Sequence, residues 1–147
     1  MTRQAWLACC VVMAACATGP ARPVEPDLGA DACAHCRMVI VSKATAAEIV
    51  APGEEPVLFD EIGCLRNYVA HTSLPDQAIV YVADHRTGAW AEAASAIFTH
   101  TTVATPMASG LLAHADAASR DADPAARGGE DVAAAAILGA WPREDRP

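Results

Sequence analysis

The sequence of 147 residues predicts a small α+β domain, on the basis of two observations. Short β-type runs and one amphipathic segment follow each other in the order strand, strand, helix, strand, and a looser second half follows. The hydrophobic fraction is 53%, although much of it is alanine, so the chain can bury one thin core. The length indicates one domain, or at most two very small ones.

The N-terminal residues have the pattern of a bacterial lipoprotein signal over residues 1–15. Arg3 supplies a positive start, residues 5–15 are uncharged and largely apolar, and small residues precede Cys16. In such a signal the cysteine is lipidated, which anchors the mature chain in the bilayer facing the periplasm or the cell exterior. The alternatives are an ordinary secretion signal cut near Ala15 or Ala17, or a cytoplasmic protein with an apolar start.

Three regions are expected after the signal. Residues 16–31 contain Pro20, Pro23 and Pro26 and few large apolar residues, which predicts an extended tether. The folded domain is expected over residues 32–140, and residues 141–147 form a polar, flexible tail.

The first half of this domain is expected to contain four strands and one helix. Asp60 is positioned to cap a helix that runs to about Ala70, with Ile62, Leu65 and Val69 on one face. A turn is expected at the Pro-Gly-Glu-Glu-Pro run of residues 52–56. The strands are expected at residues 39–41 and 46–50, which could pair as a hairpin around Ser42, and at residues 57–59 and 78–83.

The second half is less regular. Residues 89–102 are expected to be mostly extended, because β-type residues near the end outweigh the alanines. A loop of small residues at 105–110 precedes a strand at 111–113. Helical segments are expected after Asp116, after Pro124 up to Gly128, and after Asp131 up to Leu138.

Charge and motifs exclude several classes of function. The chain has 10 Lys and Arg against 18 Asp and Glu, a net charge of −8, whereas a nucleic-acid binder needs a basic surface. The sequence contains no HExxH, GxSxG or Walker-type motif, which leaves metallohydrolases, α/β-hydrolases and P-loop enzymes unsupported.

The cysteines are the strongest chemical signal. Cys33 and Cys36 form a CxxC pair, a spacing found in metal knuckles, redox dithiols and structural disulfides. A second CxxC or an HxxxH pair, which would complete a zinc site, is absent. Cys64 falls in the first turn of the expected helix, where the helix dipole favours thiolate and the acidic neighbours Asp60 and Glu61 oppose it. A buried, inert Cys64 is the alternative.

Two methionines remain after removal of the signal, Met38 beside the CxxC pair and Met107 in the loop of small residues. Neither lies in a periodic apolar stripe, although core packing is the ordinary role of methionine. Thioethers and thiolates are soft donors and select Cu(I) over harder divalent ions.

The run Cys33-Ala34-His35-Cys36-Arg37-Met38 resembles the signature of the NosL family, the nitrous oxide reductase accessory lipoproteins. Further stretches resemble the family in order, at residues 59–65, 81–84 and 105–111, with a Gly-Gly pair at 128–129. Arg37 stands where the family usually has glycine, and Leu65 where another methionine is common.

This resemblance implies an α+β fold of two ββαβ units, similar to part of organomercurial lyase. It implies a membrane-anchored Cu(I) chaperone, not an enzyme. Its partners would be a copper-receiving enzyme, nitrous oxide reductase or a relative, and a membrane assembly complex. The expected copper ligands are Cys33, Cys36, Met38, Cys64 and Met107, with His35 and His114 as secondary candidates. A Cys33–Cys36 disulfide with copper held by Met107 and other groups is the alternative.

Two other classes of function stay open from the sequence. A lipid-anchored thiol–disulfide oxidoreductase would use Cys33 and Cys36 as its redox pair. A structural lipoprotein would bind no ligand.

Overall fold

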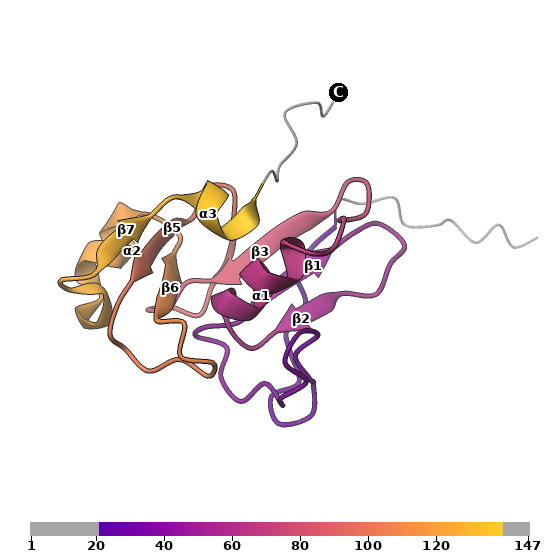
Figure 1. The fold of residues 1–147 in the computed structure, drawn as a ribbon, viewed down its shortest axis with the longest axis horizontal. Coiled ribbons are helices and arrows are strands. Elements are labelled where there is room, and N and C mark those ends of the chain that lie inside the picture. The colour runs from indigo at the N-terminus through magenta and orange to yellow at the C-terminus, as the bar shows by residue number, and fades with distance from the viewer. Residues whose placement is uncertain (1–20, 140–147) are drawn as a thin grey trace, which may run out of the picture.

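The first sheet carries the elements that lead to the cysteines. The computed structural model describes residues 21–139, so the predicted signal, Cys16 and the tail 141–147 lie outside the described residues. Strands β1 (Ala47–Val50), β2 (Val57–Phe59), β3 (Ile79–Ala83) and β4 (Trp90–Glu92) pair antiparallel in the order β2-β1-β3-β4. Helix α1 (Ile62–Val69) connects β2 to β3 (Figure 1).

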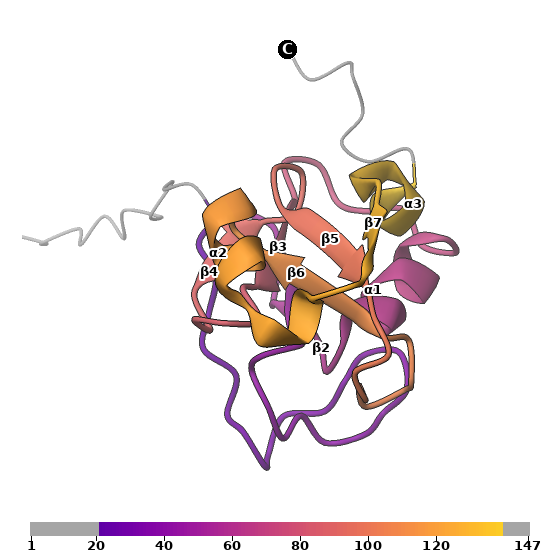
Figure 2. The same ribbon diagram turned by 90° about the vertical axis from the view of Figure 1, so that its left-hand side faces the viewer.

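The second sheet repeats this plan. Strands β5 (Ile97–His100), β6 (Leu111–His114) and β7 (Glu130–Val132) pair antiparallel in the order β6-β5-β7. Helix α2 (Ala117–Ala122) and a 3₁₀ turn (Pro124–Ala126) connect β6 to β7, and α3 (Ala134–Leu138) follows (Figure 2). Apart from β4, which adds to the edge of the first sheet, each unit runs strand, strand, helix, strand, with its first strand between the other two. The predicted α+β class is confirmed.

One hydrophobic core joins the two units. Helix α1 lies between the sheets and packs against β1, β2, β6 and α3. The ring of Phe59 meets that of Tyr68 edge to face, with centroids 5.1 Å apart. The largest members of the core come from both units: Ile49, Phe59, Ile62, Leu65, Val80, Val82, Phe98, Leu111, Ile137 and Leu138.

Two expected elements are wrong. Residues 39–41 form no strand: Val39 makes a single bridge to Ala32, and β1 pairs instead with β2 across the confirmed turn at 52–56. Asp131 caps no helix, because it lies in β7 opposite Thr99, and α3 begins at Ala134 without a side-chain cap. In the first case β1 takes the next strand along the chain as its partner, and in the second case pairing with a distant segment decides the backbone conformation.

The other expected elements agree with the structure. Residues 57–59 and 78–83 contain β2 and β3, and residues 89–102 are mostly extended as β4 and β5. Asp116 caps α2, because its carboxylate accepts a hydrogen bond from the Ser119 backbone N–H at 2.7 Å. Among the described residues no helix has the length and apolarity of a membrane span.

The described part of the predicted tether lies against the first sheet. The Tyr81 hydroxyl donates to the Ala21 carbonyl at 3.2 Å, and the Val24 backbone N–H donates to Glu48 Oε1 at 2.9 Å. Lys43 pairs with Glu25 in the same segment. Glu48 is completely buried, and its Oε2 has no hydrogen-bond partner.

Glu48 makes the stability of the domain depend on pH. Burial raises the pKa of Glu48 to about 7, although the hydrogen bond from Val24 opposes the shift. Because the folded-state pKa exceeds the unfolded one, the free energy of unfolding falls as pH rises from the ordinary glutamate pKa to about 7. Glu48→Gln removes this dependence. As pH rises from 4 to 8, the free energy of unfolding of Glu48→Gln minus that of wild type is expected to increase by up to about 3 kcal/mol.

Urea unfolding at several pH values measures the effect. Glu55→Gln is the matched control, because Glu55 is exposed. Parallel pH profiles for wild type and Glu48→Gln would contradict the prediction.

Candidate metal centre

The CxxC pair lies in a tight turn fastened to the edge of the first sheet. The Cys33 backbone N–H donates to the Met38 carbonyl at 2.8 Å, and Arg37 N–H donates back to the Cys33 carbonyl at 3.0 Å. The Ala34 N–H donates to the Leu58 carbonyl of β2 at 2.8 Å. These bonds use the free edge of β2 to hold both cysteines at one end of the sheet.

Arg37 completes the turn in a left-handed conformation, with φ 67°. Only glycine adopts this region without a steric cost from Cβ. The conformation explains why a glycine suits the position after a CxxC pair in a turn of this kind. Arg37 therefore has a sterically strained backbone, and it adds a positive charge beside the cysteines.

Replacing Arg37 by glycine is expected to stabilise the domain. Removing Cβ at a left-handed position relieves strain of roughly 1–2 kcal/mol, and the greater freedom of glycine in the unfolded chain offsets part of it. A rise of about 0.5–1 kcal/mol in the free energy of unfolding is expected from thermal or urea unfolding. Arg37→Ala is the control, because it removes the charge but keeps Cβ. If the glycine variant is no more stable than the alanine variant, the strain is not the cause.

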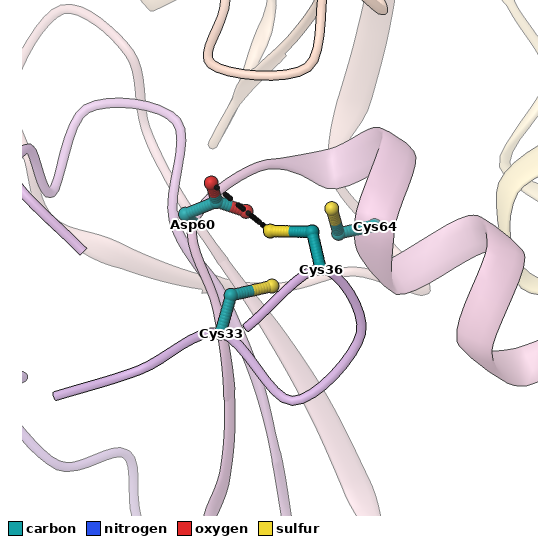
Figure 3. Close-up of side chains that lie close together, drawn as sticks. All are labelled: Cys33, Cys36, Asp60 and Cys64. Carbon is teal, nitrogen blue, oxygen red and sulfur yellow. Dashed lines mark hydrogen bonds between the residues drawn. The ribbon is translucent and has the colours of Figure 1, made fainter. Parts of the chain in front are cut away.

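Three thiols and one carboxylate converge on a single point. Cys33 and Cys36 come from the turn, Asp60 follows β2, and Cys64 lies in α1 (Figure 3). One ligand atom from each of these residues lies within 4.8 Å of those of the other three. The Cys36 Sγ lies 3.6 Å from both Asp60 oxygens. All three cysteines are free thiols in this structure.

The site is deeply enclosed on one side. Cys33 and Cys64 are fully buried, whereas Cys36 is only partly covered. Burial raises the pKa of Cys33, against hydrogen bonds from backbone groups including that of Cys36. Burial, the neighbouring Cys33 and Asp60 also raise the pKa of Cys64, so helix position does not make Cys64 a thiolate. A bound cation would supply the charge that deprotonates these thiols.

Asp60 lies in the thiol cluster, although the sequence predicts it as a helix cap. Asp60 is expected to cap α1, but the residue at the cap position is Glu61, and the Glu61 side chain makes no capping hydrogen bond. The Asp60 carbonyl accepts a hydrogen bond from the buried Thr45 hydroxyl at 2.9 Å, which holds the backbone while the carboxylate meets Cys36. Its place four residues before Cys64, at the end of a strand, is the sequence signal for this role.

The two methionines lie at the surface. Met38 is 47% exposed and Met107 is 48% exposed, so neither fills the core. The loop of Met107 packs on the start of α1, since a Cβ built on Gly63 would lie 2.6 Å from Ser109 Cβ. Gly110 closes this loop at φ 64°, where an added Cβ would meet the Thr101 carbonyl oxygen at 2.3 Å.

The two secondary histidine candidates lie outside this cluster. His35 is exposed, although it stands between the two cysteines. His114 is completely buried and belongs to a separate group with His85 and Asp123.

The cluster of Cys33, Cys36 and Cys64 beside Asp60 could hold a metal ion. Thiolates serve Cu(I), Zn(II) and iron–sulfur centres, and a carboxylate is an accepted fourth ligand of zinc. No family model, curated protein or solved structure matches the chain. The class of protein defined by fold and site is thus a small α+β domain with a thiol-rich candidate metal centre.

Proposed function

We propose that this protein is a membrane-anchored Cu(I) chaperone of the NosL type. It would bind copper at the three thiols and pass it to a copper enzyme, nitrous oxide reductase or a relative, beside a membrane assembly complex. Lipid on Cys16 would hold it at the bilayer. The convergence of Cys33, Cys36 and Cys64 within 4.8 Å, on a plan of two ββαβ units, is the observation that supports this function.

The donor set suits copper that must be released again. Cu(I) prefers soft sulfur ligands, and three thiolates satisfy it without the carboxylate. Burial raises the pKa of Cys33 and Cys64, so protons compete with the metal and loosen it. Cys36 is the partly accessible ligand, where an incoming protein could first share the ion. The exposed Met38 and Met107 are the proposed additional thioether donors to the bound ion.

Zinc binding is a second candidate because of Asp60. The sequence motifs lack a fourth zinc ligand, and Asp60 supplies one next to three thiols. A four-ligand zinc site would be structural and closed, and would bind copper only by displacement.

A thiol–disulfide oxidoreductase is less well supported. Such enzymes need an accessible thiol of lowered pKa, commonly at the start of a helix. Here both cysteines of the pair lie in a turn, Cys33 is fully buried with a pKa raised by burial, and only Cys36 is partly accessible.

Competition for the metal tests the proposal. Reduced, oxygen-free protein is titrated with Cu(I) in the presence of a colorimetric Cu(I) chelator, and separately with Zn(II). We expect about one Cu(I) per chain, bound in preference to Zn(II). Retention of one Zn(II) with no measurable Cu(I) affinity would establish the zinc site instead.

Met107→Leu tests the thioether. The substitution keeps the side-chain volume, so the free energy of unfolding should change by less than about 1.5 kcal/mol. If the sulfur binds copper, Cu(I) affinity falls by at least about tenfold, or roughly 1.4 kcal/mol. Chelator competition and the thermal midpoint are measured on the same variant.

Met38→Leu is measured in parallel as the test of the second proposed thioether donor, because Met38 is about as exposed and adjoins the CxxC turn. Unchanged affinity in a normally folded Met107→Leu protein would remove Met107 from the site.

A further inference from the structure

A second group of metal-ligating side chains lies where the two units meet, away from the thiols. His85 follows β3 in the first unit, His114 ends β6 in the second, and Asp123 lies between α2 and the 3₁₀ turn. One ligand atom from each residue falls within 4.8 Å of the other two. None of them lies in the motifs of the NosL resemblance, and His114, a secondary copper-ligand candidate, lies outside the thiol cluster.

One carboxylate oxygen faces both imidazoles. Asp123 Oδ2 lies 2.6 Å from His85 Nδ1 and 2.9 Å from His114 Nε2. The other oxygen, Oδ1, accepts a hydrogen bond from the Ala125 backbone N–H at 2.9 Å, which fixes the carboxylate. Two imidazoles and one carboxylate are a donor set that zinc and other divalent transition ions use, with one position left for solvent.

The backbone around the histidines is held rigidly. The His85 N–H donates to the Ala113 carbonyl at 2.8 Å, and the Ala115 N–H donates to Asp84 Oδ2 at 2.8 Å. These two bonds join the chain beside His85 to the chain on both sides of His114. The spacing of the imidazoles is therefore built into the fold before any ion arrives.

His114 faces the group through one ring nitrogen. Its ring is completely buried, and its Nδ1 has no hydrogen-bond partner. The two ring nitrogens point in diverging directions, so Nε2 is the His114 atom available to an ion beside Asp123. The side chain of His85 is 20% exposed, which gives an ion a path to the group.

We propose that His85, His114 and Asp123 form a binding site for a divalent transition-metal ion that links the two units. The donors are nitrogen and oxygen, so this site selects Zn(II)-type ions, while the thiols select softer ones. The ion takes the place of the hydrogens between Asp123 Oδ2 and the two ring nitrogens, and each neutral imidazole then carries its one proton on its other nitrogen.

Histidine-selective NMR with Zn(II) as the probe tests the site in the full chain. Zn(II) is added up to two equivalents, because the thiol cluster could take the first. We expect the ring nitrogen signals of His85 and His114 to shift to metal-bound positions, while those of His71 and His100 stay. No change at His85 and His114 after two equivalents would overturn the proposal. The readout does not depend on copper binding.

Variants separate the ion from the hydrogen bonds. In His85→Gln, the Zn(II) concentration needed to shift the His114 signal should rise by at least about tenfold. His100→Gln is the matched control, because His100 is exposed and outside the group. Asp123→Asn keeps the shape and removes the charge, and should weaken binding as much. Zn(II) affinity in His85→Gln within twofold of wild type would refute the site.

Discussion

Replacing Cys36 by alanine is expected to lower Cu(I) affinity by at least about a hundredfold, or roughly 2.7 kcal/mol. The variant removes one of three convergent thiols and leaves two buried sulfurs as the remaining thiol donors. Because Cys36 is only partly buried, the fold should tolerate the change. Chelator competition under reducing conditions measures the affinity, and the thermal midpoint reports folding.

His35→Ala is the matched control for Cys36→Ala. His35 lies in the same turn, is exposed, and was a secondary ligand candidate. Its loss should leave Cu(I) affinity unchanged if the thiols carry the binding. Equal loss in both variants would point to disruption of the turn, and unchanged affinity in Cys36→Ala would remove Cys36 from the site.

Asp84→Ala should destabilise the fold by about 3 kcal/mol or more. Asp84 is buried, and its carboxylate accepts hydrogen bonds from Arg86 N–H at 3.1 Å, from Thr87 N–H at 2.8 Å and from the Thr87 hydroxyl at 2.9 Å. The fourth, from Ala115 N–H, ties β3 to the end of β6. Alanine leaves these donors without partners.

Thermal and urea unfolding of Asp84→Ala measure the loss, and a fall of about 10 °C or more in the midpoint is expected. Asp76→Ala is the control, because Asp76 is exposed. Asp84→Asn should lie between wild type and Asp84→Ala, since its oxygen can still accept. A change below about 1 kcal/mol in Asp84→Ala would show that water replaces the carboxylate.

Cys36 and Asp84 both lie where one segment of the chain is hydrogen-bonded to another. The turn that carries Cys36 is fastened to β2, and Asp84 fastens the first unit to the second. A loss at Asp84 would therefore act on the whole domain, while a loss at Cys36 would act on the metal alone. Measuring affinity and stability on each variant separates the two roles.

Local patterns in the sequence are sufficient for several elements. The β-branched run of β3, the turn at 52–56 and the cap at Asp116 are decided by neighbouring residues, and all agree with the structure. The CxxC pair marks two thiols of the candidate centre for the same reason, since three residues of chain set their spacing. Membership of the NosL family and the binding of copper stay predictions.

Only the tertiary structure decided which residues meet. Cys64 joins Cys33 and Cys36 because β2 and α1 fold back on the turn, and Asp60 is drawn from an expected cap into the same cluster. His85, His114 and Asp123 are separated by 29 and 9 residues and share no motif, yet the pairing of the two units brings them together. Contacts between distant segments depend on how sheets and helices pack, and a pattern confined to one segment does not contain that information.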